Sequence, residues 1–130
     1  MFLGKKGLQK FISQTLNTKK ITTFGAEGVL EKDHPHIWNI WIRKLKENNI
    51  SFSVIYNEKS RELREREKIP FMNVRYIDRE FLVNVTTQIM DDQVNIFHWK
   101  ESPLVVVIKS KEVAKAYREE FYTMWKQAKP

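Results

Sequence analysis

The sequence predicts a single α/β domain over residues 1–130, in which helices cover both faces of a mixed, mostly parallel sheet. Two observations support this fold class. Segments with strand-like and helix-like patterns alternate along most of the chain, which is typical of strands joined by right-handed crossovers. Near the C-terminus, residues 104–108 are all apolar, as in a strand that is buried on both faces of a sheet.

The first part of the chain contains alternating helices and strands. Apolar residues at every third or fourth position predict helices, and β-branched and aromatic runs predict strands. Asp33 should cap one helix, with Pro35 in its first turn. We expect, in order, a helix at 8–16, a strand at 21–24, a helix at 33–47, a strand at 51–56, a helix at 58–68 and a strand at 73–76.

The last part of the chain begins with a hairpin. Residues 81–89 and 94–99 should form its two strands, with the turn at Asp91 and Asp92. The strand at 104–108 follows, and Ser110 should cap a final helix that has a wide apolar stripe. Ligands of such sheets bind beyond the carboxyl ends of strands, so we expect a crevice beside the tight turn at 25–28.

Composition limits the possible functions. The sequence has no cysteine, which excludes disulfides, thiolate metal sites and a cysteine nucleophile. No leader or membrane-spanning run is evident, so we expect a soluble cytoplasmic protein without membrane contact. The net charge of +7 favours polyanions, and residues 1–20 contain five lysines and no acid. His34 and His36 flank a proline without helical ligand spacing, so we expect no metal site.

Two segments resemble known proteins. Residues 81–96 resemble the hairpin that carries His-x-Lys-x-x-x-x-Asp in phospholipase-D-like enzymes. Residues 103–125 resemble the closing strand and helix of archaeal TrmB-type transcription regulators, in which a phospholipase-D-like domain follows a winged helix and a coiled coil. The resemblance implies that residues 1–130 form one phospholipase-D-like effector domain, and that the DNA-binding winged helix is not present in this chain.

The resemblance also places three residues at family positions. Asn84 occupies the histidine position, Thr86 the lysine position and Asp91 the aspartate position. An amide cannot replace the histidine nucleophile, and a threonine brings no positive charge to a phosphate. The resemblance therefore implies a chain that is not an enzyme and has no catalytic residue and no cofactor.

The altered centre should still be a crevice that binds a small polar effector, such as a sugar or another metabolite. Asn84 and Thr86 stand two residues apart, so they should face the same side of a strand. A competing interpretation is that these two side chains only satisfy polar neighbours. The candidate ligand-binding residues are Asn84, Thr86, Gly25, Glu27, His98 and Trp99.

The resemblance also suggests partners. The family's enzymes pair two copies of this fold, so we expect a homodimer, with DNA contacted only through the missing module. Two alternatives remain. One is a basic nucleic-acid-binding protein that uses the lysines of residues 1–20 and the basic residues of the last helix. The other is a divergent phosphodiesterase that employs His98 with Lys100.

Overall fold

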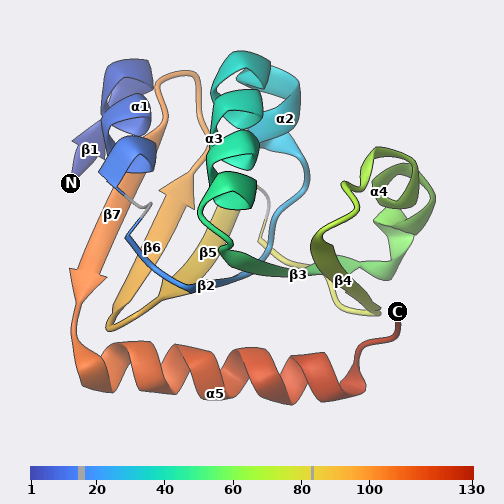
Figure 1. The fold of residues 1–130 in the computed structure, drawn as a ribbon. Helices are drawn as coiled ribbons and strands as arrows, with labels where there is room; N and C mark the ends of the chain where they lie inside the picture. Colours follow the sequence, from blue (N-terminus) through green and yellow to red (C-terminus); the bar gives the residue numbers. More distant parts are fainter. Residues whose placement is uncertain (15–16, 83) are drawn as a thin grey trace.

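The computed structural model describes residues 1–14, 17–82 and 84–130, which form one seven-stranded sheet with helices on both faces. Figure 1 shows α1, α2 and α3 over one face and α5 across the other, while α4 lies beside the β4 edge. The elements are β1 (Phe2–Leu3), α1 (Gly4–Gln14), β2 (Lys20–Phe24), α2 (Val29–Asp33), α3 (Pro35–Glu47), β3 (Ser51–Asn57), the 3-10 helix η1 (Glu58–Ser60), α4 (Arg61–Glu67), β4 (Met72–Ile77), β5 (Val85–Met90), β6 (Gln93–His98), β7 (Leu104–Lys109) and α5 (Lys111–Gln127).

The strand order is β1-β7-β6-β5-β2-β3-β4, and the sheet is mixed but mostly antiparallel. Among the described strands, only β2–β3 and β3–β4 are parallel pairs. The predicted α/β fold is confirmed, but the prediction of a mostly parallel sheet is wrong. The reason is the β5–β6 hairpin: its β5 strand pairs antiparallel with β2, and β6 then pairs antiparallel with β7.

Local signals placed most elements correctly, but β1 and α2 were not predicted and β5 begins at Val85 rather than at residue 81. Asp33 does not cap α3; it ends the short helix α2, and His34 occupies the cap position without a side-chain hydrogen bond. Pro35 is the first residue of α3, as predicted. At the other end of the chain, Ser110 caps α5 by accepting a hydrogen bond of 3.2 Å from the Val113 amide. Leu16, at the end of the predicted helix 8–16, and Val83, in the predicted strand 81–89, lie outside the described residues.

Two apolar cores flank the sheet. The larger core packs α1 and α3 against one face through residues such as Leu8, Trp41 and Leu45, and the smaller packs Phe121 and Met124 of α5 against the other. Strand β7 is less buried than its sequence suggested, because it is bordered on one side by only the two residues of β1. In the part of the chain that is described, no helix combines the length and the apolar character needed to cross a membrane.

A pocket between the sheet and the first helical layer

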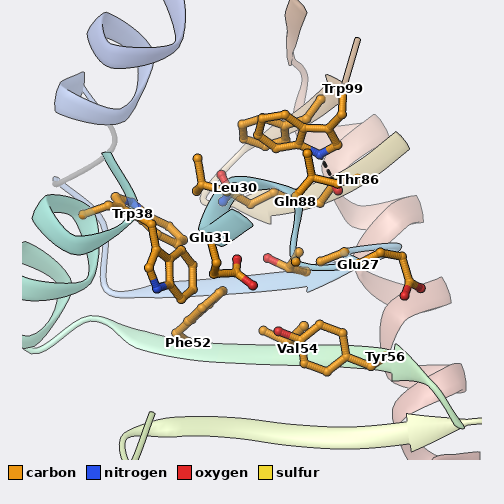
Figure 2. Close-up of a pocket in the computed structure, with 16 residues that line it drawn as sticks. Glu27, Leu30, Glu31, Trp38, Phe52, Val54, Tyr56, Thr86, Gln88 and Trp99 are labelled. Atoms are coloured by element: carbon orange, nitrogen blue, oxygen red, sulfur yellow. Dashed lines mark hydrogen bonds between the residues drawn. The ribbon is translucent and has the colours of Figure 1, made fainter. Parts of the chain in front are cut away.

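A pocket opens between the sheet and the loop that follows β2. Strands β2, β3, β5 and β6 form its floor, and residues 26–31 with two tryptophans of α3 form its other walls (Figure 2). About 50 Å³ of the pocket admits the centre of a water-sized sphere. That space corresponds to about three to five water positions, so the pocket suits a small molecule.

Aromatic side chains dominate the pocket walls. Trp38 and Trp41 lie 5.7 Å apart by ring centroids, and Trp41 meets Phe52 edge-on at 5.1 Å. Phe97 and Trp99 stack at 5.4 Å. Each pair has the spacing of favourable ring contacts, and together these rings give the pocket several π faces and edges. The six aromatic residues that line the pocket are Trp38, Trp41, Phe52, Tyr56, Phe97 and Trp99.

The sheet contributes a hydrogen-bonded polar floor. Gln88 lines the pocket and accepts a hydrogen bond of 2.9 Å from the side-chain amide of Asn95, which in turn accepts one of 2.8 Å from Gln93; Asn95 and Gln93 are not themselves in the lining. The Trp99 indole donates to the Thr86 hydroxyl at 2.8 Å. These pairs fix the floor side chains in place, since breaking a buried polar pair leaves a desolvated group without compensation.

Two polar groups in the pocket lining are unpaired. Thr23 and Trp41 are each 4% exposed, and the Thr23 hydroxyl and the Trp41 indole N–H are buried without a hydrogen-bond partner among the described residues. A buried polar group without a partner costs about 1–3 kcal/mol. A ligand that displaced the lining enough to reach these groups would gain binding energy by accepting a hydrogen bond from Trp41 and by pairing with Thr23.

The charged residues that line the pocket are Glu27 and Glu31. Glu31 accepts a bond of 2.9 Å from the guanidinium of Arg64, which also pairs with Glu67 at 3.1 Å. Arg64 is 6% exposed and the Glu31 side chain 21%, whereas Glu67 is half exposed, so only the Arg64–Glu31 pair is mostly shielded from water. Burial raises the pKa of the Glu31 carboxyl, although the neighbouring Arg64 charge lowers it in part. Glu27 accepts a hydrogen bond of 2.8 Å from the Ser60 hydroxyl.

Gly28 is required where the loop passes the Arg64 cluster. Its φ of 78° lies in the left-handed region, where a side chain is unfavourable. A Cβ at this position would also lie 2.3 Å from Nη1 of Arg64. Glycine therefore lets the first turn of α2 approach the guanidinium, and this contact places Glu31 at the pocket.

Three of the predicted ligand-binding residues line the pocket. Glu27, Thr86 and Trp99 are part of its wall, on the loop, on β5 and after β6 respectively. Gly25 lies beside them: its carbonyl accepts a long hydrogen bond of 3.4 Å from the Thr86 hydroxyl. Gly25 itself lines a different pocket, together with Phe81.

Asn84 and His98 lie outside the lining of this pocket. The expectation that Asn84 and Thr86 share a strand face is wrong, because Asn84 precedes β5 in a turn with a φ of 61°. Its carbonyl accepts a hydrogen bond of 2.7 Å from the Trp99 amide. His98 ends β6, where it pairs with Val85 and is exposed.

Asp91 belongs to a different region from Asn84. It forms the hairpin turn at the far end of β5, with a φ of 50°, and its carboxylate accepts a hydrogen bond of 2.9 Å from Thr18. Seven residues of extended chain span about 23 Å. The three aligned family positions Asn84, Thr86 and Asp91 therefore do not form one cluster in this chain.

The sequence analysis missed several lining residues. It did not select Trp38 or Trp41; Trp41 is buried, but both rings also line the pocket. It gave no role to Thr23 or Glu31, although both stand within three residues of the turn at 25–28 where a crevice was expected. Over residues 1–14, 17–82 and 84–130, no three His, Asp or Glu side chains are grouped so that they could hold a metal ion.

No protein-family model matches the chain, and no curated protein matches it in sequence. Solved structures do match its fold. NucT from Helicobacter pylori superposes with a TM-score of 0.65 at 14% identity, over 98% of this chain and 96% of NucT. Nuc from Salmonella typhimurium, a phospholipase D family member, gives 0.62 at 10% identity, over 98% of this chain and 93% of Nuc. The fold is phospholipase-D-like.

A third match has a different character. TrmBL2, an archaeal chromatin protein whose structure shows a novel mode of DNA binding, gives a TM-score of 0.63 at 16% identity over 98% of this chain. The match covers 53% of TrmBL2, so this phospholipase-D-like chain spans about half the length of that protein. The same fold is thus found in a phospholipase D family member and in a chromatin protein.

The prediction that the chain is not an enzyme is contradicted by the matches to NucT and to the phospholipase D family member Nuc. That prediction rested on Asn84 and Thr86 at the family's histidine and lysine positions. Asparagine and threonine at these positions exclude the mechanism that uses a histidine nucleophile with a lysine there. They do not exclude an activity that uses other side chains.

Proposed function

We propose that this phospholipase-D-like domain is the effector-sensing part of a TrmB-type transcription regulator, and that the effector binds in the pocket between the sheet and α3. The observation that supports a binding role is a small aromatic pocket whose lining includes Thr23 and Trp41, two residues with buried, unpaired polar groups. The shared fold of TrmBL2, a DNA-binding chromatin protein, supports the regulatory setting.

In this proposal, the effector acts by linkage. It contacts the sheet through Thr23 and the outer layer through Trp41 and Glu31, so it holds the two layers in one relative position. A ligand that prefers one arrangement of a homodimer shifts the population towards that arrangement. A DNA-binding module elsewhere in the regulator then responds to the change.

A thermal-shift screen of sugars, nucleotides, amino acids and small amines tests the binding role. A compound at a hundred times its dissociation constant should add about 2.7 kcal/mol of stability. Thr23→Val should weaken such a compound, because it removes the unpaired hydroxyl in the pocket. Thr22→Val is a matched control: Thr22 is also buried and unpaired, but the alternation of β2 places it on the face covered by α5. Equal effects of both variants, or no compound that binds, would contradict the proposal.

A second candidate function is phosphodiester hydrolysis, which the fold shared with Nuc supports. Histidine is the family's nucleophile, and this chain has three, at positions 34, 36 and 98. His98 and Lys100 are exposed and lie outside the pocket, whose acidic lining disfavours a phosphate anion.

Turnover of bis(p-nitrophenyl) phosphate tests this second candidate. If His98 is the nucleophile, His98→Ala should lower the rate at least about a hundredfold, and His36→Ala, which changes another exposed histidine, should leave it unchanged. Turnover that survives in both variants would exclude this mechanism, and an absence of turnover in the unaltered protein would exclude the activity.

Nucleic-acid binding by this domain alone receives less support from the structure. The lysines of α1 and the basic residues of α5 lie on opposite faces of the sheet (Figure 1). They therefore do not form one continuous surface for a duplex. Strong, steeply salt-dependent DNA binding by this chain would favour that alternative over the proposed effector role.

A further inference from the structure

We infer that the pocket binds a small organic cation that also carries a hydrogen-bond acceptor, such as an ammonium compound with a hydroxyl group. This inference rests on the proposed function, since it names the chemical class of the effector. Charge, ring geometry, unpaired groups and size each support it, and they come from different residues of the pocket.

The charge of the pocket is opposite to the charge of the protein. The sequence has a net charge of +7, yet the charged residues in the described lining are the acids Glu27 and Glu31. The nearest buried cation, Arg64, is already shared between Glu31 and Glu67. A carboxylate in a low-dielectric setting attracts a cation and repels an anion more strongly than it would in water.

The aromatic lining favours a cation over a neutral polar molecule of the same size. Ring faces attract cations within about 6 Å of the ring centroid, and tryptophan does so best. Figure 2 shows Trp38 and Trp99 on different sides of the pocket, with the Glu31 carboxylate turned inward over the β3 residues. In the same view the Glu27 carboxylate points away, so Glu31 is the acid that a bound cation would approach.

An ammonium group alone would leave the unpaired groups unsatisfied. The indole N–H of Trp41 can only donate, so it needs an acceptor on the ligand, whereas the Thr23 hydroxyl can donate or accept. The space of about 50 Å³ allows only a few heavy atoms of the ligand to enter the pocket, and any further atoms would have to lie at its mouth. A short hydroxyalkyl ammonium compound meets both conditions.

Isothermal titration with three compounds of similar size tests the inference on the unaltered protein. Choline has the charge and the hydroxyl, 3,3-dimethylbutan-1-ol has the same shape without the charge, and tetramethylammonium has the charge without the hydroxyl. Choline should bind at least about tenfold more tightly than the neutral alcohol and more tightly than tetramethylammonium. Glucose and inorganic phosphate should not compete with it.

Two variants separate the contributions of charge and hydrogen bonding. Glu31→Gln should weaken choline at least about tenfold, whereas Glu47→Gln, which changes an exposed acid on α3, should leave the affinity unchanged. Trp41→Phe should remove the preference for choline over tetramethylammonium. The indole N–H of Trp41 has no hydrogen-bond partner among the described residues. Any fall in the melting temperature of Trp41→Phe should therefore come from the smaller ring and not from a broken hydrogen bond.

The outcomes distinguish this inference from the proposed function. Equal affinity for choline and the neutral alcohol would overturn the cation inference. The cation inference would also be overturned if a neutral or anionic compound bound instead of choline and Thr23→Val weakened the binding of that compound. That result would leave the proposed effector role intact. Failure of every class of compound to bind would overturn both.

Discussion

Replacing Arg64 with methionine should lower the free energy of unfolding by about 3 kcal/mol, because it removes the ion-pair partner of the mostly buried Glu31 carboxylate. Arg64 is 6% exposed and bridges Glu31 and Glu67, and its guanidinium also packs against Gly28. Without it, burial would act on Glu31 uncompensated and raise the pKa of that carboxyl further. Urea unfolding at neutral pH measures the loss.

The same variant makes a prediction about pH. A raised pKa in the folded state means that folding favours the protonated form of the Glu31 carboxyl. Ionisation of Glu31 therefore lowers the free energy of unfolding. The loss should therefore be full at neutral pH and should shrink as the pH falls through the raised pKa of Glu31. Arg66→Met, an exposed position on α4, is the control and should change stability by less than about 0.5 kcal/mol. Equal losses in both variants would contradict the role assigned to Arg64.

Replacing Trp99 with alanine should cost about 3–5 kcal/mol and abolish ligand binding. Trp99 is 8% exposed, stacks on Phe97, and donates its indole hydrogen bond to Thr86. Trp99→Phe keeps the ring stack and loses only the hydrogen bond, so it should cost about 1–3 kcal/mol, mainly for the unpaired Thr86 hydroxyl. Chemical unfolding of both variants gives the comparison. If alanine and phenylalanine cost the same, the ring does not support the pocket wall as described.

The elements of the fold could be predicted because their signals are local. The apolar spacing of α3 and the Ser110 cap of α5 can be recognised within a few residues of sequence. The sheet order could not be predicted in this way, since β5 pairs with β2 across about sixty residues of chain, and nothing near either strand determines that pairing. Because both hairpin strands pair antiparallel with their neighbours, the sheet is mostly antiparallel and not mostly parallel as predicted.

The candidate site was only partly predictable for a similar reason. Thr86, Trp99 and Glu27 stand on the hairpin and on the glycine turn, which the sequence analysis had selected. The alternation argument failed for Asn84 because this residue has a left-handed backbone and lies just before β5, which begins at Val85. The unpaired state of Thr23 depends on packing between distant segments, so the sequence contained no signal for it.

The four tryptophans provide the most direct test of the claim that this pocket binds the effector. Trp38, Trp41 and Trp99 line the pocket, whereas Trp125 packs on the other face of the sheet with α5. In a ¹H–¹⁵N spectrum assigned with Trp→Phe variants, saturating choline should shift the indole N–H signal of Trp41 most and leave that of Trp125 in place. The same spectrum should be recorded with any compound that stabilises the protein in the screen. Binding that moves Trp125 and leaves Trp41 unchanged would contradict the account.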